Sequence, residues 1–103
     1  MKKLLSILLI LLINSNITAQ NSYTISGYIT DKSSGENLIG VSIYDKETFK
    51  GTVTNQYGFY SLTLKEGKYE IVYSFIGLKS VTKEINLDKY KRIIVSLESD
   101  AII

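Results

Sequence analysis

Residues 23–30 read YTISGYIT, and their apolar and polar side chains alternate with a period of two. One face of this segment carries Ile25 and Ile29, and the other carries Thr24 and Tyr28. Such alternation is typical of a strand with one buried face. The same period recurs along most of the chain, and no stretch after residue 20 has the 3.6-residue period of a helix.

Working outward from this strand, the alternation predicts six more short strands, separated by polar, glycine-containing turns. They lie near residues 41–44, 51–54, 59–64, 69–76, 81–87 and 93–97. About seven short strands at even spacing predict an all-β fold, an antiparallel, Greek-key-like β-sandwich in one domain. The predicted inward-facing residues are Ile25, Ile29, Val41, Ile43, Tyr60, Leu62, Ile71, Tyr73, Phe75, Ile85, Val95 and Leu97.

The composition excludes several kinds of chemistry. The chain of 103 residues has no His and no Cys, so it offers no imidazole base, no thiol nucleophile, no disulfide and no Cys/His zinc site. Lys2 and Lys3 supply the whole formal charge of +2. The rest of the chain is neutral overall, which argues against nucleic acid as a partner. We therefore expect no enzyme activity, no cofactor and no metal.

The first 20 residues, MKKLLSILLILLINSNITAQ, have the three-part layout of a secretory signal. Two lysines precede a ten-residue apolar run at 4–13, and Ala19 supplies a small residue before the expected cleavage point. The run is too short to span a membrane, which takes about 20 apolar residues. We expect a signal peptide at 1–19, export, and a mature domain of residues 20–103 without a membrane span.

A series of short motifs recurs in a recognisable order along the predicted strands. The motifs are GYITD at 27–31, GE at 35–36, LIGVSI at 38–43, GTVTN at 51–55, YGFYSL at 57–62, GKY at 67–69 and SFIGL at 74–78. This order resembles the carboxypeptidase regulatory-like domain, a transthyretin-like (prealbumin-like) β-sandwich. More narrowly, it is similar to the version at the N-terminus of TonB-dependent outer-membrane receptors of the starch-utilisation type. Asn55 replaces a frequent Asp of that family, and Asn37 and Ile39 replace frequent prolines.

The resemblance implies a non-catalytic periplasmic domain, located at the outer membrane if it is part of a receptor. Its expected partner is the plug or barrel of such a receptor, or another envelope protein. No barrel fits in the mature residues, so the sequence is either part of a longer receptor or a stand-alone secreted module, for example one that binds glycans. The reading frame beyond Ile103 would distinguish the two.

Five aromatic residues are candidates for contact with a protein or a glycan. They are Tyr28, Tyr44 and Phe59 on outward strand positions, and Phe49 and Tyr57 in loops. Exposed aromatic rings stack on sugars and anchor protein partners. The alternative is that tyrosine is simply favoured in strands.

Acidic residues are weaker candidates. Asp31, Glu36, Asp45 and Asn55 have oxygen ligands for Ca²⁺, but their spacing matches no calcium loop. The pairs Asp45/Glu47 and Glu66/Glu70 have the residue type of glycoside hydrolases, without a predicted pocket around them. We interpret all of them as solvated turn and surface charges.

Overall fold

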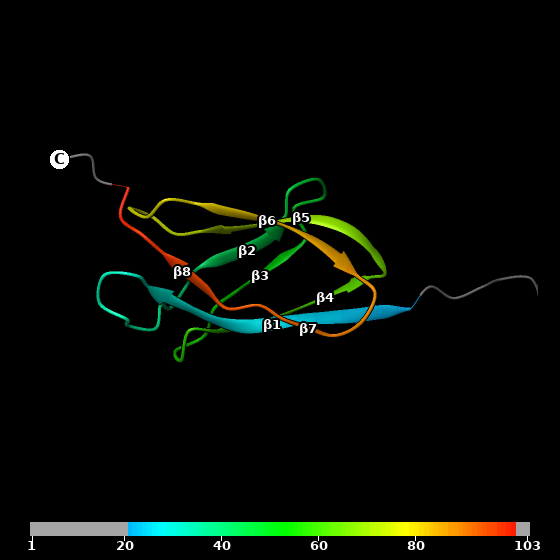
Figure 1. The fold of residues 1–103 in the computed structure, drawn as a ribbon, viewed down its shortest axis with the longest axis horizontal. Coiled ribbons are helices and arrows are strands. Elements are labelled where there is room, and N and C mark those ends of the chain that lie inside the picture. Colours follow the sequence, from blue (N-terminus) through cyan, green and yellow to red (C-terminus); the bar gives the residue numbers. More distant parts are fainter. Residues whose placement is uncertain (1–20, 101–103) are drawn as a thin grey trace, which may run out of the picture.

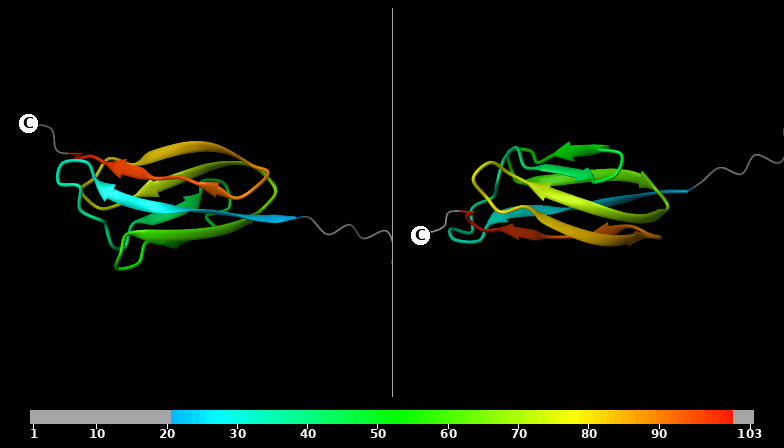
Figure 2. Two further views of the ribbon diagram at one scale, coloured as in Figure 1. Left: turned by 60° about the horizontal axis from the view of Figure 1, so that its bottom comes forward. Right: turned by 90° about the horizontal axis from the view of Figure 1, so that it is seen from above.

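Residues 21–100 form a sandwich of two β-sheets in the computed structural model, which describes this range (Figures 1 and 2). The predicted signal peptide at 1–19 lies outside the described residues. The strands are β1 (Ser22–Asp31), β2 (Ser42–Asp45), β3 (Gly51–Val53), β4 (Phe59–Lys65), β5 (Gly67–Ser74), β6 (Val81–Leu87), β7 (Lys91–Arg92) and β8 (Val95–Leu97). The prediction of an all-β sandwich is confirmed.

The strand order puts the chain's first strand at the centre of one sheet. This sheet has the order β4–β1–β7, and β8 also pairs with β1; the other sheet has the order β3–β2–β5–β6. Strands β4 and β5 belong to different sheets and are joined by the single residue Glu66, so the chain crosses there between layers. Strands β3 and β6 lie at the margins of one sheet, and β4 lies opposite β7 and β8 at the margins of the other, a position that matters for contacts with other molecules.

The core lies between the two inner faces, and the alternation of buried and exposed residues is clearest in β4. Apart from Phe75, all the residues predicted to face inward are buried. Phe75 is half-buried because β5 ends at Ser74 and the chain turns toward Gly77, which has a φ of 83°. Phe75 still packs against the core, as its predicted inward position requires, but it is not fully buried. Leu64, Leu87 and Val72 complete the buried set.

The C-terminal part differs most from the sequence prediction. One strand was expected at 93–97, but β7 and β8 are separated by Ile93 and Ile94, and both pair with β1 in parallel. At this break Ile93 donates its N–H to the carbonyl oxygen of Ser26 at 2.8 Å. A Cβ on Gly27 would lie 2.0 Å from the carbonyl oxygen of Ile93, so only glycine permits this approach. The close crossing displaces Ile93 from a regular ladder.

None of the residues from 21 to 100 is helical, and this part of the chain contains no helix able to cross a membrane.

Candidate contact surfaces

The five candidate aromatic residues do not form one site. Tyr28 and Phe59 are cross-strand neighbours on the outer face of the β4–β1 sheet, with ring centroids 5.4 Å apart. Tyr44 and Phe49 stack at 5.9 Å on the outer side of the β2–β5 sheet. Tyr57 is exposed in the turn before β4. The sandwich therefore separates the candidates into two pairs on opposite outer faces, with Tyr57 apart from both.

Phe49 is the most unusual of these residues. Its φ is 63°, and no other non-glycine residue in the described range has a positive φ. The left-handed conformation costs an ordinary residue about 1–2 kcal/mol. Its side chain is 73% exposed, so burial does not offset that cost. The stacking contact with Tyr44, with 27° between the rings, stabilises the turn by about 0.5–1.5 kcal/mol and so offsets part of that cost.

The β2–β3 hairpin holds Phe49 in place through Asp45. The backbone N–H of Phe49 donates to the carbonyl oxygen of Asp45 at 2.8 Å. The backbone N–H of Asp45 in turn donates to the carbonyl oxygen of Lys50 at 2.9 Å. The buried Asp45 carboxylate accepts the Thr48 hydroxyl at 2.7 Å and the Glu47 N–H at 3.3 Å. Asp45 therefore organises the turn. Because it is only 4% exposed, the interpretation of Asp45 as a solvated surface charge is wrong.

A shallow hollow lies beside the Tyr44–Phe49 pair along the edge of the sheet. Its lining consists of Ser42, Ile43, Tyr44, Phe49, Gly51, Thr52 and Val53. None of these side chains is charged, and Val53 is 60% exposed. An uncharged hollow with an aromatic wall suits an apolar side chain or the face of a sugar ring.

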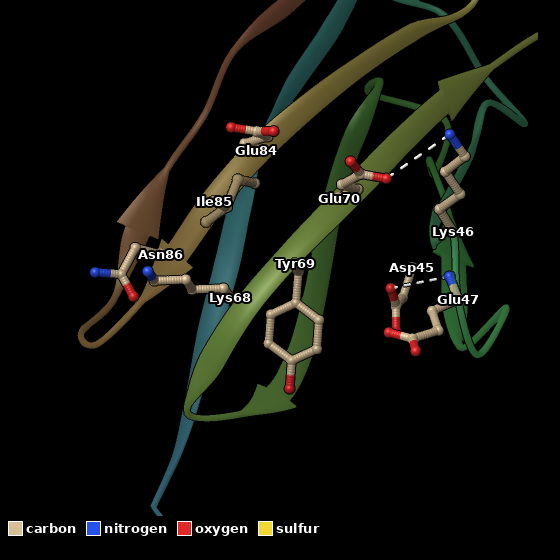
Figure 3. Close-up of a pocket in the computed structure, with 9 residues that line it drawn as sticks. All are labelled: Asp45, Lys46, Glu47, Lys68, Tyr69, Glu70, Glu84, Ile85 and Asn86. Atoms are coloured by element: carbon tan, nitrogen blue, oxygen red, sulfur yellow. Dashed lines mark hydrogen bonds and ion pairs between the residues drawn. The ribbon is translucent and has the colours of Figure 1, made fainter.

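A second hollow, about 640 Å³ in volume, is lined by residues from the start of the β2–β3 turn and from strands β5 and β6 (Figure 3). Its lining includes Lys46, Glu70 and Glu84, and Lys46 lies 3.7 Å from Glu70. Glu70 is directly opposite Glu84 across the two strands. Such like-charge neighbours are mildly destabilising. The described residues contain no cluster of three acidic side chains suited to a metal ion.

Two other residues considered as calcium ligands, Asp31 and Asn55, also act locally. Asp31 accepts the backbone N–H and the hydroxyl of Ser33, at 2.8 and 2.7 Å. These hydrogen bonds lower the pKa of the Asp31 carboxyl below its ordinary value. Asn55 accepts the N–H groups of Tyr57 and Phe59, at 2.9 and 3.1 Å, and so closes the turn before β4. These contacts are those of turn residues.

The buried tyrosines form a polar contact inside the core. The hydroxyls of Tyr60 and Tyr73 lie 3.0 Å apart, and Tyr60 also donates to the carbonyl oxygen of Ile93 at 2.8 Å. Burial raises the pKa of both phenols above the ordinary value. Both side chains are almost completely buried, so they contribute to stability and are not accessible to a ligand.

Sequence reasoning missed two features of the hairpin surface. Nothing in the residue type of Phe49 indicates a positive φ, because glycine and asparagine are the usual residues there. Val53 was treated only as part of a strand, although β3 is an edge strand and leaves this side chain exposed. Its position directly opposite Ser42 on the outer face could be inferred only once the β2–β3 register was known.

Comparison with known proteins agrees with this fold. A family profile described as "CarboxypepD_reg-like domain" matches residues 25–103. The TonB-dependent receptor P39 of Formosa agariphila is 36% identical over 100 residues, which cover 93% of this chain and 9% of the receptor. The chain thus spans less than a tenth of that relative's length.

Solved structures give the same architecture at low identity. The Bacillus anthracis TIE protein matches with a TM-score of 0.59 at 18% identity, over 76% of this chain and 17% of that one. The group B streptococcus pilus 2b backbone protein matches with a TM-score of 0.55 at 16% identity, over 81% and 43%. These likenesses support the sandwich fold alone.

Proposed function

Because the chain belongs to the carboxypeptidase regulatory-like domain family, we propose that it acts as a non-catalytic contact domain of a TonB-dependent outer-membrane receptor, on the periplasmic side. The similarity to the Formosa agariphila receptor supports this proposal. The match to a small part of a much longer receptor is expected for a domain that serves a separate transport unit. The absence of His and Cys from the sequence is consistent with a role that depends on contact.

The observation that carries the proposal is the Phe49 side chain. A strained backbone position and an exposed aromatic ring both reduce stability, and a glycine at this position would avoid both. Residues with such costs concentrate at sites of function. Large aromatic side chains are also frequent anchors of protein interfaces. We infer that Phe49, with Tyr44 and Val53, contacts the plug or barrel of the receptor.

The electrostatics of this surface favour an apolar partner residue. Lys46, next to the turn, is paired with Glu70, and the hollow beside Phe49 has an uncharged lining. An apolar side chain of the receptor would enter the hollow without leaving a charge unpaired. Burial of the exposed Phe49 ring would then supply much of the binding free energy.

The way the chain leaves the sandwich gives this contact a mechanical consequence. Lys79 donates to the carbonyl oxygen of Glu98 at 2.8 Å, and Asp100 donates to that of Gly77 at 3.2 Å. Leu78 and Ser99 form an isolated β-bridge. The last described residues are therefore fastened to the body of the domain. A receptor contact at Phe49 would thus fix the point from which the following chain starts.

A stand-alone glycan-binding module is the second candidate. The stacked Tyr44–Phe49 pair beside an uncharged hollow favours it, because sugar rings stack on such aromatic faces. Phe49→Ala and Tyr44→Ala would each abolish binding of an oligosaccharide to the isolated domain in this case. Tyr28→Ala, on the opposite face, would leave such binding intact.

A photo-crosslinking experiment tests the receptor contact. The photoreactive amino acid p-benzoylphenylalanine is placed at position 49 of the full-length receptor in cells, and at position 76 in a control. Ile76 is 96% exposed and is not part of the hairpin. We expect position 49 to crosslink to peptides of the receptor's plug or barrel, and position 76 to crosslink much less. Equal crosslinking at both positions, or none at position 49, would contradict the assignment of Phe49.

A further inference from the structure

Strand β4 is the least protected of the strands at the sheet margins. Its sequence FYSLTLK has one charge, at its last residue, and contains neither Gly nor Pro. Strand β6 carries Lys83 and Glu84, and the marginal strands β3, β7 and β8 have at most three residues. Proteins usually protect an edge strand with charges, prolines or short length. An edge with none of these is expected to be covered by another strand.

The pairing of β4 with β1 shows which main-chain groups face outward. Ile29 donates to the carbonyl oxygen of Gly58, and Glu66 donates to that of Asn21. In the antiparallel register these bonds place Leu62 in a hydrogen-bonded pair with Ile25. Ser61 and Thr63, at the alternate positions, therefore direct their N–H and C=O groups away from β1.

The ends of this edge are occupied by other contacts. The carbonyl oxygen of Phe59 accepts the N–H of Asn55 at 2.9 Å, and the N–H of Phe59 donates to the side-chain oxygen of Asn55 at 3.1 Å. The carbonyl oxygen of Lys65 accepts the Tyr69 hydroxyl at 2.6 Å. Within residues 21–100, no hydrogen bond uses the main-chain groups of Ser61 or Thr63. Two donors and two acceptors are thus available, placed symmetrically on either side of Leu62.

We propose that β4 pairs antiparallel with β4 of a second copy of this chain, about a twofold axis at Leu62. In this register Ser61 of each copy lies opposite Thr63 of the other, and four main-chain hydrogen bonds form. The contact uses the same surface on both copies and closes as a dimer. It goes beyond the proposed receptor contact, because it uses the other sheet.

The charges on this strand fit a second copy. Lys65 would lie opposite Phe59 of the other copy, where the Phe59 ring contacts Tyr28 at 5.4 Å between centroids. An ammonium group over an aromatic face is a favourable contact, and the register places no two like charges opposite each other. The outer face around the axis carries the hydroxyls of Ser61, Thr63 and Thr24, so two copies meet without burying a charge.

The size of the contact predicts a weak, reversible dimer. A pairing through one short strand belongs to the class of interfaces below about 1,200 Å². We expect a dissociation constant of about 10 µM or weaker. Such a dimer would be populated where the copies are held close together, as in a membrane-attached assembly.

The first test combines sedimentation with hydrogen exchange on residues 20–103, after unfolding experiments have shown that this part folds alone. Between about 10 µM and about 1 mM, we expect the weight-average mass to rise toward that of a dimer. Over the same range, exchange of the Ser61 and Thr63 amides should slow by about twofold to sevenfold, in proportion to the fall in the monomer fraction. The Leu62 N–H is already hydrogen-bonded to β1 within the sheet, so its exchange rate should not change. A monomer at all concentrations, or unchanged exchange at both positions, would overturn the proposal.

The second test exchanges charges across the proposed axis. Ser61→Lys/Thr63→Lys places like charges opposite each other and should abolish the dimer, whereas Ser61→Lys/Thr63→Glu places opposite charges there and should restore it. Thr82→Lys/Ser96→Lys adds the same charge away from β4 and should have no effect. If the Lys/Glu variant is also monomeric, or if the two amides are protected only by the rest of the receptor, β4 does not pair with a second copy.

Discussion

Gly27→Ala tests the crossing of β1 and the segment between β7 and β8. The added methyl group would lie 2.0 Å from the carbonyl oxygen and 2.7 Å from the carbonyl carbon of Ile93. Both of these are main-chain atoms, so relief requires a shift of the backbone by about 1 Å. Forcing an extra methyl group into a packed site costs about 1–3 kcal/mol.

The shift would also break the hydrogen bonds made by Ile93. Its N–H donates to Ser26, and its carbonyl oxygen accepts the Tyr60 hydroxyl, both at 2.8 Å. Each bond contributes about 0.5–1.5 kcal/mol. Together with the overpacking cost, the free energy of unfolding should fall by about 4 kcal/mol. That is a large part of the 5–15 kcal/mol typical of a domain.

Urea unfolding of residues 20–103, followed by tyrosine fluorescence, measures this change. With an m-value of about 1–2 kcal/mol/M, the midpoint should fall by about 2–4 M. Gly67→Ala is the matched control, because its Cβ would meet nothing closer than 3.7 Å and its φ is not positive. We expect that control to stay within about 0.5 kcal/mol of the wild type or to gain stability slightly. Equal stabilities of the two variants would refute the close crossing.

Three further predictions concern the core and the turns. Tyr60→Ala should lower the free energy of unfolding by about 3–5 kcal/mol, because the residue is 1% exposed. Tyr60→Phe should lower it by about 1–2 kcal/mol through the loss of two hydrogen bonds. A change below about 0.5 kcal/mol in either variant, measured by urea unfolding, would contradict this. Thr54→Val should cost about 2 kcal/mol in the same assay, because the buried hydroxyl accepts the N–H of Val41 and donates to the carbonyl oxygen of Leu38, at 2.9 and 2.6 Å; an unchanged midpoint would mean that these backbone groups find other partners. The raised pKa values of Tyr60 and Tyr73 predict that their contribution to stability is complete below pH of about 10, the ordinary phenol value, and is lost as the pH rises above it; absorbance titration of the eight tyrosines should therefore show two that ionise only with unfolding, and complete ionisation of a folded protein would contradict this.

The sequence was sufficient to predict the sandwich and nearly all of its core. Alternation identifies the buried side of a strand because the geometry of an extended chain has a period of two, and Ile25, Ile43 and Ile71 follow this rule. The rule also places Phe75 inward, but this side chain is only half-buried because the strand has already ended. The rule fails at Val72, which has outward parity but lies opposite Tyr44 and is 8% exposed. The residue at which a strand ends, and the neighbour that covers a side chain across the sheet, depend on the pairing register. The period of a sequence does not determine that register.

The arrangement of the contact surfaces was beyond sequence reasoning for a related reason. Parity correctly placed Tyr28 and Tyr44 outward, but only the strand order shows that they are on different sheets. The break at Ile93 results from its approach to Gly27, a contact between residues far apart in the sequence. The unprotected edge of β4 likewise becomes apparent only when β4 is known to be marginal. These features arise from topology, whereas the core arises from local pattern.

The central claim is that this domain serves a receptor by contact through Phe49. The most direct measurement compares substrate uptake per receptor in cells that produce the full-length receptor, its Phe49→Gly variant, and a form without residues 23–97. Phe49→Gly removes the ring and relieves the positive φ of 63°, so the domain itself should remain stable. Ile76→Ala removes an exposed apolar side chain elsewhere and is the control. We predict that uptake at equal receptor level falls in both the glycine variant and the deletion, and stays normal in the control. Unchanged uptake in the deletion at unchanged receptor level would contradict the proposed function, and a loss in the deletion with normal uptake in Phe49→Gly would contradict the role of Phe49.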